Sequence, residues 1–288
     1  MKKIIPHTAV AVLICTVAAC ASDPGVLPPT NPFDRGRVTQ RELRLEAEGL
    51  YKAARQSLES SDFVLAIERY NQVVARYPFS AYAIQAELER LYAYHRNFEN
   101  DLAVDAADRF LRDHPRHPFA DYVHYLKGVV NQSREDSFAA SLGFDSTKED
   151  VSYARRAFDD FSLLVQKYPD SRYAADARQR MVYLRNRIAA NELHVVRYYQ
   201  KRGADLAAAR RAEQVVARYP GTPAARQGLI LMEQSYRRLG LTQQADDAQR
   251  LMAANGVDPV RDNVLPDPPL QRLGELTLEL MFPPREAE

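Results

Sequence analysis

The feature of this sequence that most restricts its fold is a dipeptide, an aromatic residue or histidine followed by proline, that occurs four times. The four pairs are Tyr77-Pro78, His114-Pro115, Tyr168-Pro169 and Tyr219-Pro220. Each pair follows a stretch of helix-forming residues, and proline cannot continue a helix, so each pair marks a helix end. The spacing predicts one helical unit repeated along the chain.

Aligning the four segments on their prolines brings two further positions into register. The residue 12 positions before the proline is always alanine: Ala66, Ala103, Ala157 and Ala208. The residue five positions before it is larger and apolar: Val73, Phe110, Leu164 and Val215. Small residues let two helices approach closely, and larger apolar residues fill the groove beside them. This is the pattern of the tetratricopeptide repeat, a helix–turn–helix unit of 34 residues; a chance series of amphipathic helices is the alternative.

The pattern predicts an all-α fold, an α-solenoid of about five such repeats within residues 38–256. No β-alternating run bounded by turn residues occurs there. In the first expected pair the two helices begin at residues 47 and 63, and the second pair covers 84–115. The third pair consists of 119–132 and 151–167, separated by a polar insert at 133–150. A long helix over 172–201 precedes a break at Gly203 and a helix ending at Tyr219, and the last pair covers 223–239 and 241–255 around Gly240, with Ala245 at its small position.

The amino-terminal residues 1–19 read as an export leader. Lys2 and Lys3 precede an apolar run that is too short to span a bilayer, and Val17-Ala18-Ala19-Cys20 resembles a bacterial lipobox. The resemblance implies cleavage before Cys20 and N-acyl and S-diacylglycerol lipid on that cysteine, with Ala21 favouring the outer membrane. An ordinary secretory signal with a chance cysteine is the alternative. Residues 20–37 are proline-rich and read as the lipidated terminus and its linker.

Residues 257–288 form a proline-rich tail that we expect to be largely disordered. A short helix induced by a partner is the alternative, because leucines could line one side of it: Leu270, Leu273, Leu276 and Leu280.

Composition excludes several kinds of function. Apart from Cys20 the only cysteine is Cys15, within the leader, so no disulfide is expected. Losing Lys2 and Lys3 leaves 37 basic against 38 acidic residues. A near-neutral surface gives no electrostatic support for a nucleic-acid partner.

No arrangement of residues predicts an enzyme, a metal site or a cofactor other than the lipid. His114 and His117 flank a proline, which prevents the one-face helical spacing of a metal pair. Asp159 and Asp160 are neighbours in sequence, so they project differently around a helix and do not form an acid–base pair. A glycine-rich phosphate loop and a serine nucleophile elbow are both missing from the sequence. Function is therefore expected to reside in surfaces.

Stacked helix pairs offer an extended concave surface to a partner. In tetratricopeptide geometry the first helix of each pair lines it, which predicts a substrate-peptide surface of aromatic and basic residues: Tyr51, Arg55, Tyr92, His95, Arg96, Tyr122 and Tyr125. Aromatic rings supply apolar area and arginine can grip a carboxylate with two hydrogen bonds. For any one of these tyrosines, packing between repeats is the alternative role.

The lipobox, the linker and the five units together resemble the BamD family of outer-membrane β-barrel assembly lipoproteins. The resemblance is carried by residues 76–80 (RYPFS), 91–94 (LYAY), 117–123 (HPFADYV) and 157–161 (AFDDF). It implies a scaffold facing the periplasm whose last two units dock the BamA subunit, with Arg202–Arg218 and the Gly240 loop as candidate contacts.

The same resemblance implies a groove on the first three units for the carboxy-terminal segments of unfolded outer-membrane proteins, and association with other Bam lipoproteins. A related lipoprotein that organises peptidoglycan or polysaccharide-export machinery is the alternative function.

Overall fold

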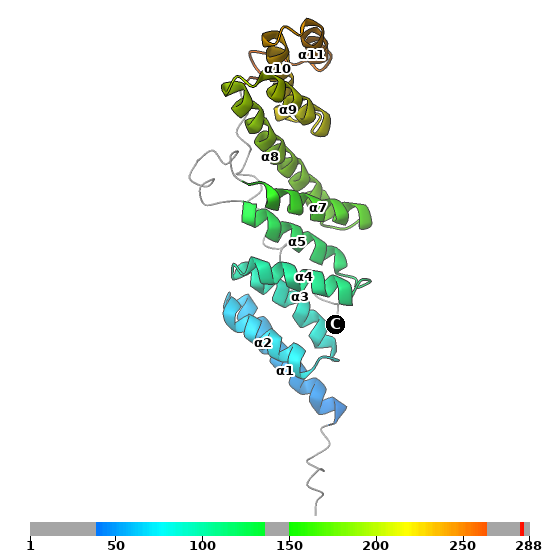
Figure 1. Cartoon of the computed structure of the whole chain (residues 1–288). Coiled ribbons are helices and arrows are strands. Elements are labelled where there is room, and N and C mark those ends of the chain that lie inside the picture. The colour runs from blue at the N-terminus through cyan, green and yellow to red at the C-terminus, as the bar shows by residue number, and fades with distance from the viewer. Residues whose placement is uncertain (1–38, 136–149, 264–282, 285–288) are drawn as a thin grey trace, which may run out of the picture. The chain divides into compact units, whose positions relative to one another are not determined.

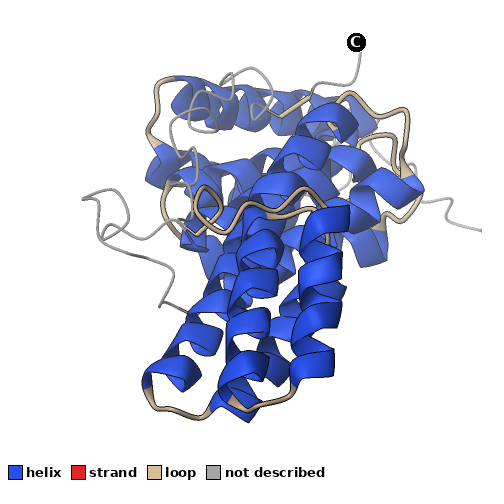
Figure 2. Cartoon of the chain, turned by 90° about the horizontal axis from the view of Figure 1, so that it is seen from above, coloured by secondary structure: helices blue, strands red, loops and turns tan. Residues whose placement is uncertain are grey.

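The computed structural model describes residues 39–135, 150–263 and 283–284 of the 288-residue chain. Within these ranges the secondary structure consists of ten α-helices and no strand (Figure 2). The prediction of an all-α fold built from helix pairs is confirmed. The leader, Cys20, the linker, the leucines of the tail and most of the polar insert lie outside the described residues.

The helices follow the predicted units closely. Their bounds are α1 Gln40–Glu59, α2 Phe63–Arg76, α3 Ala81–Arg96, α4 Asn100–Asp113, α5 Ala120–Glu135, α7 Ser152–Lys167, α8 Ala174–Lys201, α9 Asp205–Arg218, α10 Pro223–Arg238 and α11 Thr242–Ala254. The one clear difference is that α1 begins well before residue 47. Thr39 and Glu42 form a reciprocal cap there: the Thr39 N–H donates to the Glu42 carboxylate at 2.7 Å, and the Glu42 N–H donates to Thr39 Oγ1 at 3.2 Å.

The positions that define the repeat lie where helices meet. The four registered alanines and Ala245 are fully buried, and the four larger apolar residues are 0–2 % exposed. After each proline-terminated helix, the aromatic or histidine residue before the proline donates its N–H back into the helix; the Tyr77 N–H, for example, bonds to Val73 O at 2.9 Å. The repeat pattern thus encodes both the helix ends and the close contacts.

Consecutive helices pack on one another from α2 to α11, and α10 also packs on α8 (Figure 1). The 28-residue helix α8 takes part in two hydrophobic cores. Tyr183, Leu184 and Ile188 pack with the helices that precede it, whereas Leu193 and Val196 pack with α9, α10 and α11. The continuous helix predicted over 172–201 therefore links two cores. Among the described residues, no helix is both long and apolar enough to cross a bilayer.

Three glycines have clear structural roles. Gly203 and Gly240 take positive φ angles of 69° and 71° at the predicted helix breaks, a conformation that costs glycine little. Gly128 lies where α5 meets α7: a Cβ there would lie 2.6 Å from the ring of Phe161, which is fully buried. The absence of a side chain at Gly128 is what allows this ring to pack against α5.

Candidate functional site

The residues with possible catalytic or metal-binding character are engaged in structure. No group of three potential metal ligands occurs among the described residues. The His114 ring packs on Phe110 at 5.0 Å and its Nε2 lies 3.3 Å from Glu87. Asp160 accepts a hydrogen bond from Asn131 at 2.7 Å, whereas Asp159 is exposed, so the two aspartates point to different surroundings.

The first candidate site is centred on Glu89 of α3, which is completely buried. Tyr51 of α1 and Tyr70 of α2 donate their hydroxyls to its carboxylate at 2.8 and 2.6 Å. Gln85 Nε2 donates to it at 2.9 Å, and Arg55 of α1 forms an ion pair with it. One carboxylate therefore connects the first three helices.

The electrostatics of this cluster are those of a buried ion pair. Burial is the largest single effect and lowers the pKa of Arg55. The charge of Glu89, the hydrogen bond to Glu59 and the two tyrosines together outweigh burial, so the pKa lies above its ordinary value. Burial, followed by the charge of Glu89, raises the pKa of Tyr70 far above its usual range, so its hydroxyl stays protonated and donates. The cluster thus combines an ion pair between Arg55 and Glu89 with a tyrosine hydroxyl that donates to the same carboxylate.

Two of the three predicted surface residues of α3, Tyr92 and Arg96, lie on one face of that helix together with Gln85 and Glu89. Gln85, Glu89, Tyr92 and Arg96 follow at spacings of four, three and four residues, which places them in a line of about 16 Å. Tyr92 is buried, and its hydroxyl accepts a hydrogen bond from Arg96 at 3.0 Å. Arg96 remains partly exposed and also lies over the Phe63 ring at 5.1 Å. We call these four residues the α3 face.

His95 lies beside this face rather than on it. Its Nδ1 is 3.3 Å from Asn100 Oδ1, and burial lowers the pKa of the ring. The imidazole is therefore neutral at physiological pH and is not a cationic partner for a carboxylate. Its predicted place in a peptide surface rests on shape and hydrogen bonding rather than on charge.

Tyr122 and Tyr125 are completely buried in α5. Tyr125 stacks on Tyr173 with ring centroids 4.9 Å apart and donates its hydroxyl to Asp176 at 2.8 Å. Tyr122 also packs on Tyr173, at 5.8 Å. In this structure both rings hold α5 against α8, the packing role that the sequence left open. Of the predicted set, Tyr51 and Arg55 meet at Glu89, Tyr92 and Arg96 meet on the α3 face, and the last two tyrosines lie in the core.

Sequence reasoning missed the two polar residues that organise this site, Gln85 and Glu89. A signal existed: Arg55 and Glu89 are opposite charges separated by 34 residues, one repeat length, so they occupy similar places in successive units. The predicted surface consisted only of aromatic and basic residues, so it left out Glu89, the acidic partner of Arg55.

The carboxy-terminal tail also reaches this site. Pro283 is buried, and the carbonyl oxygen of Pro284 accepts a hydrogen bond from Gln85 Nε2 at 2.9 Å. The described part of the tail thus contacts α3, 199 residues away in sequence. The expectation of a largely disordered tail did not include this contact of residues 283–284 with a helix of the same chain.

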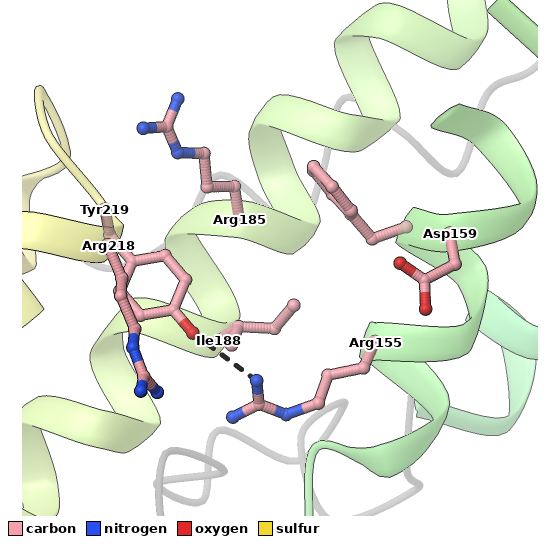
Figure 3. A pocket seen from close by; sticks show the side chains of 7 residues that line it. Arg155, Asp159, Arg185, Ile188, Arg218 and Tyr219 are labelled. Carbon is pink, nitrogen blue, oxygen red and sulfur yellow. Dashed lines mark hydrogen bonds between the residues drawn. The ribbon is translucent and has the colours of Figure 1, made fainter. Parts of the chain in front are cut away.

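A second candidate site is a pocket of about 270 Å³ between α7, α8 and the end of α9 (Figure 3). Its basic lining residues are Arg155, Arg185 and Arg218, its apolar ones are Phe158 and Ile188, and Asp159 and Tyr219 complete it. Arg155 pairs with Glu192 at 2.8 Å and lies 3.4 Å from the Tyr219 hydroxyl, while Arg185 donates to the carbonyl of Pro220 at 2.9 Å. The lining contains three arginines and one carboxylate, that of Asp159, which makes this pocket suited to an anionic group.

Comparison with known proteins places these sites within a family. A family model described as outer membrane lipoprotein, YfiO, matches residues 44–251. An outer membrane protein assembly factor BamD of Neisseria meningitidis serogroup A is 40 % identical over 209 residues, 72 % of this chain and 78 % of the relative. The chain belongs to the BamD family. Members named likewise from Vibrio cholerae and Pasteurella multocida are 34 % and 30 % identical, covering 82 % and 88 % of this chain and 92 % of each relative.

The match to the BamD family covers the residues of both candidate sites. The α3 face, Arg55 and the arginine pocket all fall within residues 44–251. Pro283 and Pro284 fall beyond the matched range. The tail contact on Gln85 is therefore a feature of this chain that the family model does not describe.

Proposed function

We propose that this chain is a lipid-anchored, non-enzymatic scaffold of the outer membrane that faces the periplasm and helps to assemble β-barrel proteins. The single observation that carries the proposal is the match to the BamD family, which extends over nearly all of the helical repeats. The relatives are named assembly factors.

We propose further that the α3 face binds an extended segment of an unfolded outer-membrane protein. Gln85 would bond to the peptide backbone, and Arg96 would hold the terminal carboxylate of the segment. The roughly 16 Å between these two residues corresponds to about five residues of extended chain. Tyr51, stacked on Tyr82 at 5.3 Å, borders the face with aromatic area for an apolar side chain.

A peptide-binding measurement tests this assignment. The probe is a fluorescent decapeptide with the sequence of the last strand of an outer-membrane β-barrel protein, ending in phenylalanine, prepared with a free and with an amidated carboxy terminus. Amidation should weaken binding to the wild-type chain by about tenfold, one charge-assisted bond, and should have little effect on Arg96→Gln. Arg90→Gln is the control, since Arg90 lies on α3 but off this face. Equal amidation effects in all three chains would refute the role of Arg96.

We propose that the arginine-rich surface of α8 and α9 docks the BamA subunit, with the arginine pocket as the point that receives an acidic group. Charge complementarity of this kind sets partner choice and association rate. Arg218 is exposed and lines the pocket. Arg218→Glu should reduce the amount of BamA recovered with the chain several-fold, whereas Arg109→Glu, at an exposed arginine of α4 outside the last two units, should not.

Co-purification from detergent-solubilised envelope tests the function as a whole. Recovery of BamA and the other Bam lipoproteins with the tagged chain would support the proposal. Recovery of peptidoglycan or polysaccharide-export proteins without BamA would favour the alternative scaffold function.

A further inference from the structure

The tail contact at Gln85 has a specific chemical character. The side-chain amide of Gln85 donates two hydrogen bonds through Nε2, one to Glu89 and one to the carbonyl of Pro284, each 2.9 Å long. Both partners are acceptors, so the assignment of this amide is fixed: the nitrogen must be the atom that faces them, and the oxygen takes the adjacent position of the amide group. Glu89 in turn is held by Tyr51, Tyr70 and Arg55.

The oxygen of the same amide has no hydrogen-bond partner among the residues that the structure describes. Gln85 is only 9 % exposed, and its Oε1 is buried. Both Pro283 and Pro284 lack a backbone N–H, so neither can supply the missing donor. A buried acceptor without a donor is unfavourable, because its hydration is lost and nothing replaces it. The Gln85 amide can recognise both the C=O and the N–H of a peptide backbone. The tail supplies only the C=O, which accepts from Nε2.

We propose that the Pro283–Pro284 segment is an intramolecular placeholder on the α3 face, and that an extended, proline-free peptide displaces it by also donating a backbone N–H to Gln85 Oε1. This inference rests on the proposed peptide-binding function of the same face and adds its regulation. The tail covers the face while no client is present, and the client displaces it because it completes the hydrogen bonding of Gln85.

A tethered ligand of this kind competes effectively even when it binds weakly. Attachment to the same chain gives the tail an effective concentration on the order of 1 mM. A tail with an intrinsic dissociation constant of about 0.1 mM would then occupy the face about nine-tenths of the time and weaken the apparent affinity for a client about tenfold. The tail does not abolish binding; it sets a threshold that a proline-free segment must exceed.

The test uses the full-length mature chain and one substitution in the tail. Pro283→Asp puts a charge at a buried position, which weakens docking of the tail while leaving the helical repeats unaltered. Pro259→Asp is the matched control, the same change at an exposed proline. The proline-free decapeptide defined above should bind Pro283→Asp about tenfold more tightly than it binds wild type or Pro259→Asp. Equal affinity for all three chains would overturn the proposal.

A second probe separates failure of this inference from failure of the proposed function. A fluorescent peptide with the sequence of residues 277–288 should bind Pro283→Asp, compete with the decapeptide there, and bind wild type about tenfold less tightly. It should not bind Pro283→Asp that also carries Gln85→Leu. If the decapeptide binds no chain while the tail peptide shows this pattern, the client assignment is wrong and the placeholder is upheld. If the tail peptide binds wild type and Pro283→Asp alike, or binds neither, the placeholder is wrong whatever the decapeptide does.

Discussion

Replacing Glu89 by leucine tests whether this buried carboxylate holds the first three helices together. The change removes the acceptor of two tyrosine hydroxyls and of Gln85, and it takes from Arg55, only 8 % exposed, its buried counter-charge. Removing one partner of a buried ion pair costs about 3–5 kcal/mol, because the remaining charge stays desolvated. For a domain of this size, about 3 kcal/mol corresponds to a fall in Tm of about 6–12 °C.

The assay must report on the affected units, because stacked repeats interact only with their neighbours and unfold partly independently. Urea unfolding followed by circular dichroism gives the overall loss of stability. Amide hydrogen exchange should show the loss concentrated in α1, α2 and α3, with α9 to α11 unchanged.

The matched control is Glu59→Leu, which removes the other carboxylate near Arg55. Glu59 lies 3.1 Å from Arg55 Nε, but its side chain is 50 % exposed, so its loss should cost less than about 1 kcal/mol. If Glu89→Leu destabilised the chain no more than Glu59→Leu, the reasoning that makes Glu89 the centre of the cluster would be refuted.

Three further predictions follow from other parts of the molecule. Gly128→Ala should cost about 1–3 kcal/mol in urea unfolding, because its Cβ would lie 2.6 Å from the buried Phe161 ring; an unchanged midpoint would contradict the packing described for α5 and α7. Burial lowers the pKa of His124 to about 4, whereas the unfolded ring has a pKa of about 6.5. The unfolded chain therefore binds the proton first, and stability should fall as pH drops from about 6.5 to about 4, by about 2 kcal/mol after allowance for water near the ring; His124→Gln should remove this part of the pH dependence of Tm. Cys20→Ser should leave the mature chain without lipid in intact-mass measurement and release it from the membrane fraction, and a lipidated, membrane-bound variant would show that the anchor lies elsewhere.

Helix ends and close contacts were accessible from the sequence because local chemistry determines them. A proline stops a helix wherever it occurs, and an alanine at a crossing point is small in any context. Ala66, Ala103, Ala157 and Ala208 accordingly lie fully buried. The early start of α1 was missed although it too is local: Thr39 and Glu42 have the spacing of a capping box.

The candidate site was only partly predictable because it depends on pairings between units. Arg55 and Tyr51 look like surface residues of an amphipathic helix until Glu89, more than 30 residues later, is placed against them. The same applies to Tyr125, whose partners Tyr173 and Asp176 belong to the next helix pair. Residue type and spacing indicated which side chains gather on the first helices of the units, but not which of them the neighbouring unit would cover.

The buried charge pair is best understood as a means of positioning rather than of stabilising. A pair such as Arg55 and Glu89 gains little over apolar residues of similar size, because desolvation offsets its attraction. What apolar residues cannot do is orient an amide. Glu89 accepts from Gln85 Nε2 and so fixes the position of Gln85 Oε1, the acceptor for the backbone N–H of the proposed client. A buried charge of the α3 face is therefore connected to recognition. The hydroxyls and the guanidinium fix the carboxylate, the carboxylate fixes the amide, and the amide distinguishes a proline tail from a segment with a free backbone N–H.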